Sequence, residues 1–143
     1  SQVPLFILGP GIRPGAGKSL ASNIDMAPTL LDLAGLQIPE RMHGKSIKPV
    51  LLGQKEKVRN ALIYEGLGNY GGAKPNLTVI NNKYRYIITY EDESLSRISF
   101  TELYSIKNDP HEMNNLASHS DYEVIMKQLD SIINEHKTAV LGQ

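Results

Sequence analysis

Alternating side chains between residues 78 and 90 restrict the fold of this chain more than any other feature of its sequence. Two β-type segments, 78–81 and 84–90, flank the polar pair Asn82-Lys83. Side chains alternate between the two faces of a β-strand. One face of the second segment therefore carries Tyr84, Tyr86, Ile88 and Tyr90. The pattern predicts an antiparallel hairpin with one buried face.

The last part of the chain carries a helical pattern instead. Between residues 120 and 136, side chains suited to one helix face recur every three or four positions. This stripe consists of Tyr122, Ile125, Met126, Leu129, Ile132, Ile133 and His136. Ser120 and Glu123 have the spacing of a capping box at its start. With further strands at 61–65 and before Tyr104, we expect a small antiparallel sheet packed against a closing helix.

The first part of the chain has the pattern of an α/β protein. Leu5–Leu8 is a continuous apolar run between Pro4 and a Gly-Pro-Gly turn, which is typical of a strand buried on both faces of a parallel sheet. A helix should follow, with Asp25 as its N-cap, Pro28 in its first turn and Gly35 after its end. We interpret Asp25 as a capping residue rather than a catalytic one.

The charged cluster at residues 54–57 is the best candidate for a boundary. It divides the chain into 1–58, the end of a larger α/β domain, and 59–143, a small C-terminal subdomain with the sheet and the closing helix. The chain begins with Ser1 rather than Met and enters an apolar run almost at once. We therefore expect it to be a fragment of a longer protein, an α/β fragment that is α+β when taken alone.

Composition excludes several classes of function. The 143 residues include 15 basic and 15 acidic side chains, so a basic surplus that would favour nucleic acid is absent. No apolar run approaches the roughly 20 residues that a membrane-spanning helix needs. The sequence contains no cysteine, which excludes disulfides, thiolate metal sites and a cysteine nucleophile in these residues.

Two glycine-rich segments look like nucleotide-binding loops and fail on closer inspection. The segment 9–19 ends in Gly-Lys-Ser, but Ile12 stands where a phosphate loop requires its first glycine. The segment 66–71 matches G-x-G-x-x-G, yet Gly72 and Pro75 break the helix that should follow. We interpret both segments as loops, and loops on a rigid scaffold often carry binding residues.

The stretch Glu102–Ala117 combines the end of a strand with a tightly specified turn. Asp109-Pro110 stops regular structure, because proline restricts both its own backbone and that of the residue before it. The acids and amides that follow can bond backbone N–H groups in a compact loop. Leu116 gives the loop an apolar anchor.

This stretch resembles the C-terminal signature of sulfatases, E-L-Y-D-L-x-x-D-P-x-E-x-x-N-L-A. The matching residues are Glu102, Leu103, Tyr104, Asp109, Pro110, Glu112, Asn115, Leu116 and Ala117. Ser105 and Ile106 depart from the usual Asp-Leu. Three earlier segments, 3–12, 25–35 and 44–53, resemble the family's V-P-x-x-x-x-G-P-G-I, D-x-x-P-T-L-L-D-L-A-G and G-x-S-x-x-P-x-L-x-G patterns, in the family's order. Tyr84–Ile87 is similar to its R-Y-K-Y-I segment.

The resemblance implies the C-terminal part of an enzyme that hydrolyses sulfate esters. Sulfatases use a formylglycine made from Cys or Ser within C/S-x-P-x-R, and a divalent cation, usually calcium. This sequence has neither that motif nor the family's metal-binding motifs. We therefore expect no catalytic residue and no metal ligand here, and an inactive fragment that packs against a missing N-terminal domain. The resemblance also implies a periplasmic, secreted or lysosomal location.

Substrate-facing residues are expected at the end of the strand 61–65 and in the loop after it. These candidates are Tyr64, Glu65, Tyr70 and Lys74. Lys74 could pair with a sulfated saccharide or remain solvated. Two alternatives stay open: the C-terminal part of a phosphonate or phosphodiester hydrolase of the same superfamily, and a free-standing binding module without catalysis.

Overall fold

The structure, a computed structural model, describes residues 3–68 and 72–142 of the chain. The chain divides into two compact units, Ser1–Asn60 (unit 1) and Ala61–Gln143 (unit 2). Within the described residues, no helix is long and apolar enough to cross a membrane.

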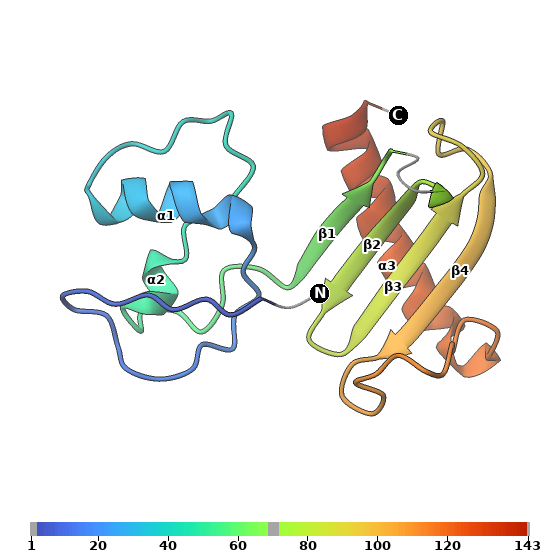
Figure 1. Ribbon diagram of the computed structural model, residues 1–143, viewed down its shortest axis with the longest axis horizontal. Helices are drawn as coiled ribbons and strands as arrows, with labels where there is room; N and C mark the ends of the chain where they lie inside the picture. Colours follow the sequence, from blue (N-terminus) through green and yellow to red (C-terminus); the bar gives the residue numbers. More distant parts are fainter. Residues whose placement is uncertain (1–2, 69–71, 143) are drawn as a thin grey trace. The chain divides into compact units, whose positions relative to one another are not determined.

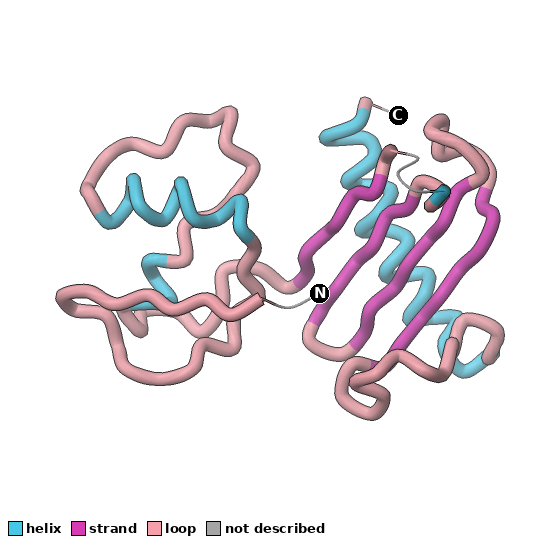
Figure 2. The backbone as a smooth tube through the Cα atoms, viewed as in Figure 1, coloured by secondary structure: helices cyan, strands magenta, loops and turns pink. Residues whose placement is uncertain are grey.

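Unit 2 is a four-stranded sheet with a helix on one face (Figure 1). Its strands are β1 (Ala61–Gly66), β2 (Asn76–Asn81), β3 (Tyr84–Tyr90) and β4 (Ile98–Ser105). They lie side by side in sequence order, and each pairs antiparallel with the next (Figure 2). The expected antiparallel sheet is confirmed.

The strands β2 and β3 form the predicted antiparallel hairpin. Val79 lies opposite Tyr86, and Thr78 lies opposite Ile87. Residues directly opposite each other share one face of the sheet, so the side chains of Val79 and Tyr86 meet on the buried face. The Asn81 side-chain oxygen accepts hydrogen bonds from the backbone N–H groups of Lys83 (2.8 Å) and Tyr84 (2.7 Å) and so closes the turn. The turn therefore holds the pairing that places Tyr86, Ile88 and Tyr90 on the buried face.

The core of unit 2 forms where α3 (Glu123–His136) covers that face. Nine side chains with at most 4% of their surface exposed form it: Leu77, Val79, Tyr86, Ile88, Tyr90, Leu95, Leu103, Leu129 and Ile133. Burial of such a side chain is worth about 1.5–3 kcal/mol, so this cluster is the main source of the unit's stability. The helical stripe read from the sequence is confirmed as packing surface.

The start of α3 differs from the prediction. A 3-10 turn, Ser120–Tyr122, precedes the helix, and no side chain caps it. The expected capping box between Ser120 and Glu123 is wrong, because the Glu123 N–H donates to the backbone carbonyl of Ser120 in the 3-10 turn rather than to its side chain.

Unit 1 contains a 3-10 turn (Asn23–Asp25), α1 (Met26–Leu33) and α2 (Lys48–Leu51). The predicted end of α1 is confirmed. Gly35 has φ of +71°, Leu36 N donates to the carbonyl of Leu31 at 2.9 Å, and Gly35 N donates to that of Asp32 at 3.1 Å. These two bonds are the Schellman arrangement that terminates helices at glycine.

The expected strand at Leu5–Leu8 is not formed. Residues 3–8 have no regular structure, and Phe6 and Leu8 are 87% and 95% exposed. A strand needs neighbouring strands to satisfy its backbone groups. The described part of unit 1 supplies none, so the prediction is wrong for this chain by itself.

The helix α1 presents apolar side chains to the outside and polar ones to the inside. Leu30 of α1 is 67% exposed, and Ile24 before the helix and Leu36 after it are exposed as well. Asp25 and Thr29 are instead buried against the rest of unit 1. This arrangement is the reverse of that in an independent globule, where the apolar face of a helix points inward.

Candidate functional site

One end of the sheet in unit 2 gathers the two loops that follow β1 and β3. The connection from β1 to β2 spans 67–75, and that from β3 to β4 spans 91–97. Tyr90 N, at the end of β3, donates to the carbonyl of Pro75 at 2.8 Å and so fastens the first connection to this strand. Figure 1 shows that α3 also ends at this edge. We name this end of unit 2 the loop edge.

The structure separates the sequence-predicted site residues. Tyr64 is 44% exposed. It lies on the sheet face opposite α3, since its neighbour Ile63 packs against the core. Glu65 points to the α3 side, where its Oε1 lies 2.5 Å from His136 Nε2. Tyr70 lies outside the described residues. Tyr64 and Glu65 therefore do not converge on one site.

Lys74 lies at the loop edge and is already paired. Its Nζ donates to Glu91 Oε2 at 2.6 Å and to Ser99 Oγ at 2.9 Å. Hydrogen bonds from Lys74 and Ser99 hold the pKa of Glu91 below its usual range, so the carboxylate stays charged. A ligand anion at Lys74 would have to compete with this carboxylate, which sequence reasoning did not foresee.

His136 was assigned to the apolar stripe of the closing helix, and its contact with Glu65 was missed. The next residue, Lys137, donates to the carbonyl of Leu95 at 2.7 Å. Neither contact has a signal in the sequence, because the partners are 71 and 42 residues away.

The most buried charged group is Asp25 in unit 1. Its carboxylate accepts hydrogen bonds from the backbone N–H groups of Ser22 and Lys45, both at 2.8 Å, and from both terminal nitrogens of Arg59. Burial raises the pKa of Asp25, but the bonds from Arg59, Lys45 and Ser22 outweigh it and lower the pKa overall. Asp25 therefore stays ionised beside a permanent cation.

This environment makes Asp25 a structural residue. Four donors occupy its two oxygens, so no lone pair remains well placed to accept a substrate proton. Asp25 occupies the predicted N-cap position of α1, but its side chain makes no capping bond to that helix. The carboxylate instead accepts from the nearby Ser22 N–H and from the distant Lys45 and Arg59. The bond from Lys45 to Asp25 brings the backbone at residues 44–45 close to that at residues 24–25. This requires glycine at position 44, where an added Cβ would lie 2.0 Å from the carbonyl oxygen of Ile24.

The signature stretch Glu102–Ala117 is also structural. Asn115 Oδ1 accepts from the N–H groups of Leu103 and Ala117, both at 3.0 Å, and its amide nitrogen donates to the carbonyl of Thr101 at 3.1 Å. Asp109 Oδ2 accepts from Asn114 N at 2.8 Å. These contacts fasten the turn to β4, as the sequence predicted.

Glu112 completes the signature turn through the sheet. It adopts a φ of +57°, which is uncommon for a residue other than glycine, and its Oε2 accepts from Arg85 Nη1 of β3 at 2.6 Å. The hydrogen bond from Tyr104 to Glu102, together with partial burial, raises the pKa of Tyr104 to about 12. Each charged or polar side chain named here is engaged within the protein.

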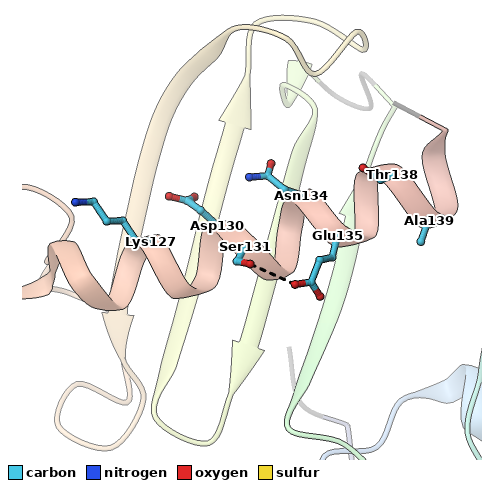
Figure 3. Close-up of a pocket in the computed structure, with 7 residues that line it drawn as sticks. All are labelled: Lys127, Asp130, Ser131, Asn134, Glu135, Thr138 and Ala139. Atoms are coloured by element: carbon cyan, nitrogen blue, oxygen red, sulfur yellow. Dashed lines mark hydrogen bonds between the residues drawn. The ribbon is translucent and has the colours of Figure 1, made fainter.

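A groove of about 680 Å³ runs along the outer face of α3 (Figure 3). Its lining comes from this helix and from the π-helical segment Lys137–Leu141 that follows it: Lys127, Asp130, Ser131, Asn134, Glu135, Thr138 and Ala139. Ser131 Oγ donates to Glu135 Oε1 at 3.2 Å. Side chains from one helical surface cannot surround a ligand, so this groove is a poor candidate for a reaction site.

The described residues do not fit the calcium site that the resemblance implies. Among residues 3–68 and 72–142, no three His, Cys, Asp or Glu side chains gather closely enough to hold a metal ion. The sequence also lacks the C/S-x-P-x-R motif from which formylglycine is made.

Comparison with known proteins identifies the family. The sequence profile described as N-sulphoglucosamine sulphohydrolase, C-terminal, matches residues 1–139. The chain belongs to this family of sulfatase C-terminal regions, and the resemblance seen in the signature stretch is confirmed.

The chain spans about a quarter of the length of the similar proteins named here, of which two carry sulfatase names. Arylsulfatase K of Xenopus laevis is 29% identical over 97% of this chain and 27% of its own length. N-acetylglucosamine-6-O-sulfatase of Bacteroides thetaiotaomicron is 32% identical over 94% of this chain and 24% of its own. The solved structure of BT4656 with its substrate D-glucosamine-2-N,6-O-disulfate has a TM-score of 0.68 at 31% identity, and covers 80% of this chain and 23% of that one.

Proposed function

We propose that these residues form the C-terminal part of a sulfatase that hydrolyses sulfate esters of carbohydrates or aryl alcohols. The observation that carries this proposal is the match of the family profile to residues 1–139. It is supported by relatives named as sulfatases, of which the chain spans about a quarter. The chain contributes structure and a border of the substrate site rather than the reacting groups.

The reacting groups would come from the preceding part of the protein. Ester hydrolysis of this kind requires a nucleophile and cations that neutralise the sulfate oxygens. The family's formylglycine and calcium would supply them, and the residues described above fit neither. The 143 residues by themselves should therefore be inactive.

The exposed apolar side chains of unit 1 support the proposal that another part of the protein covers this unit. The helix α1 exposes Leu30, and the 3-10 turn before it exposes Ile24 and buries Asp25. In the run 3–8, the apolar side chains of Val3, Leu5, Phe6 and Leu8 are exposed. Exposed apolar surface of this kind marks an interaction site. We propose that the preceding domain covers both features and that 3–8 pairs there as a strand, which would supply the missing backbone partners.

The loop edge of unit 2 is the proposed border of the substrate site. Of the predicted site residues, Glu65 and Lys74 lie at the strand ends that form it. Lys74 is the group suited to a sulfated ligand, because an ammonium attracts the anion, and the disulfated glucosamine bound by BT4656 carries such anions. Tyr64 and Tyr70 remain candidates for contacts at its rim.

A periplasmic, secreted or lysosomal location is part of the proposal and rests on the family resemblance alone. Fractionation of cells that express the intact protein with a C-terminal tag would check it. Recovery of the protein in the cytosolic fraction alone would contradict this part.

Turnover measurements test the proposed activity. The protein encoded by the complete reading frame should hydrolyse an aryl sulfate and a sulfated monosaccharide, and the isolated 143 residues should hydrolyse neither. A matched aryl phosphonate and a phosphodiester complete the set of substrates. Hydrolysis of these two in preference to the sulfates would move the protein to the alternative hydrolase class, and turnover by the isolated chain would overturn the assignment of its role.

Substitution of Lys74 tests the substrate border. Lys74→Ala in the intact protein should lower kcat/KM on a sulfated saccharide by roughly tenfold, since a charge-assisted hydrogen bond is worth about 1.5–3 kcal/mol. Lys83→Ala is the matched control, because Lys83 is an exposed lysine in the turn at the opposite end of the hairpin. Equal kcat/KM values for both variants and the wild type would remove Lys74 from the site.

A further inference from the structure

We propose that three polar contacts form a closed ring at the loop edge, and that Glu91, His136 and Lys137 thereby act as positioning residues for Lys74. The ring joins the two ends of the β1–β2 connection to the β3–β4 connection and to the end of α3. Only the predicted effect of the ring on substrate binding rests on the proposed function. The ring itself is a property of unit 2.

The first contact holds the β1–β2 connection where it begins. Glu65, the penultimate residue of β1, lies 2.5 Å from His136 Nε2 through its Oε1. His136 is the last residue of α3. The helix end is therefore fastened to the strand that leads into this connection.

The second contact holds the same connection where it finishes. Lys74 donates to Glu91 at 2.6 Å and to Ser99 at 2.9 Å, two residues before β2 begins at Asn76. Glu91 directly follows β3, and Ser99 is the second residue of β4. The contact thus joins the β1–β2 connection to both strands that flank the β3–β4 connection.

The third contact closes the ring. Lys137, next to His136, donates to the carbonyl of Leu95 at 2.7 Å and lies 5.2 Å from the centre of the Tyr90 ring. Leu95 has a φ of +52° and a side chain that is buried in the core. A leucine adopts such a backbone only where its surroundings hold it there, and the bond from Lys137 is one of these restraints.

The turn around Leu95 is independently organised, which makes the third link rigid. Asp92 accepts hydrogen bonds from the N–H and the hydroxyl of Ser94, and Leu95 N donates to the carbonyl of Asp92 at 3.2 Å. Glu91 N donates to the carbonyl of Arg97 at 2.9 Å. The position of Glu91, and so that of Lys74, is therefore coupled to Leu95 and to the end of α3.

A closed ring has a consequence that separate surface contacts lack. An isolated exposed ion pair contributes little, because its two long side chains lose entropy when they meet. Here His136, the last residue of α3, contacts the end of β1, and the next residue, Lys137, contacts the β3–β4 connection. Because the two residues are adjacent, a contact made by one also restricts the position of the other. Loss of any link should therefore loosen segments that the substituted residue does not touch.

Lys137→Met is the most informative variant, because Lys137 contacts the β3–β4 connection and not Lys74. Hydrogen exchange in the intact protein should become roughly threefold faster at residues 72–77 as well as at 91–97, as expected for loss of a modest surface contact. His136→Gln should give the same result at 72–77. Lys127→Met and His119→Gln, which change exposed residues in the middle of α3 and before it, serve as controls.

Two outcomes overturn the ring. Faster exchange confined to 91–97 in Lys137→Met would show that its links are independent. Equally faster exchange throughout all four strands, in step with a lower melting temperature, would assign His136 and Lys137 to general stability instead.

Kinetics on the same variants test the consequence for substrate. With sulfated saccharide, KM should rise roughly threefold with kcat unchanged, because a displaced Lys74 weakens binding and leaves the chemistry intact. A lower kcat at constant KM would overturn the positioning role. If the intact protein hydrolyses no sulfate ester, the proposed function fails, whereas the exchange data still decide whether the ring exists.

Discussion

At the scale of single residues, the Asp25–Arg59 pair shows how a buried charge can be required by the fold rather than by chemistry. Both side chains are almost completely buried, and the carboxylate also accepts two backbone N–H groups from separate segments. A buried ion pair of this kind is costly to assemble but still more costly to break, because the remaining charge loses its partner. We therefore expect Asp25 to be intolerant of substitution although it takes no part in a reaction.

Substitution of Asp25 should destabilise unit 1. Asp25→Asn leaves Arg59 buried without a counter-charge, so the free energy of unfolding should fall by about 3–5 kcal/mol. Chemical denaturation of the intact protein measures this change. Asp121→Asn provides the control, since Asp121 is an exposed aspartate in the turn before α3. A loss below about 1 kcal/mol for Asp25→Asn would show that the pair is unimportant.

The pH dependence of stability follows from the same pair. The pKa of Asp25 is lower in the folded protein than in the unfolded chain, so its stabilising contribution is complete above the unfolded value of about 3.9. That contribution is lost as the pH falls through the folded value. Denaturation midpoints should therefore decrease below about pH 4 in the wild type, and this part of the decrease should be absent in Asp25→Asn.

At the scale of elements, the turn in Glu102–Ala117 shows why a family signature need not contain catalytic residues. Asn115 and Leu116 supply hydrogen-bond partners to backbone groups on the outer edge of β4, the last strand of the sheet among the described residues. Asn115 alone joins three backbone groups, and Leu116 N donates to the carbonyl of Leu103 at 2.8 Å. The turn delivers the chain from β4 to α3, so it determines where the closing helix can pack.

Asn115→Ala should destabilise unit 2 without a direct effect on chemistry. Its removal leaves the N–H of Leu103 and the carbonyl of Thr101 without these partners, at a cost of about 1–3 kcal/mol. Thermal unfolding measures the loss, and Asn114→Ala is the matched control because Asn114 contributes its backbone N–H to the turn. Equal melting temperatures for the two variants would contradict the structural role of the Asn115 amide.

At the scale of the whole molecule, the two units differ in how complete they are. Unit 2 has a closed apolar core between its sheet and α3. Unit 1 buries an ion pair and exposes leucines along α1. Apolar side chains that remain in water do not contribute the free energy of burial to folding. We propose that the preceding domain of the protein covers this surface.

Leu30→Lys distinguishes a covered surface from a free one. In the isolated 143 residues the change should be tolerated and should reduce binding of a hydrophobic dye, because Leu30 is 67% exposed. In the intact protein it should destabilise by about 2–5 kcal/mol, the range for loss of a buried leucine. A tolerated Leu30→Lys in both forms would show that α1 faces solvent.

The sequence by itself determined the elements whose signals are local. Period-two alternation in Tyr84–Tyr90, the stripe from Tyr122 to Ile133 and the glycine after α1 each specify backbone geometry or one buried face within a few residues. The same local patterns indicated the family and the structural character of its signature turn. For the segment Leu5–Leu8 a local pattern was insufficient, since a strand exists only where other strands bond to it.

The tertiary structure alone decided which polar groups meet. Asp25 finds Arg59 across 34 residues, Lys74 finds Glu91 across 17, and His136 finds Glu65 across 71. Charged side chains are compatible with many partners, and their pairing depends on distances that arise only when the strands and helices pack. For this reason the candidate residues Glu65 and Lys74 could be read from the chain, whereas the contacts that restrain them could not.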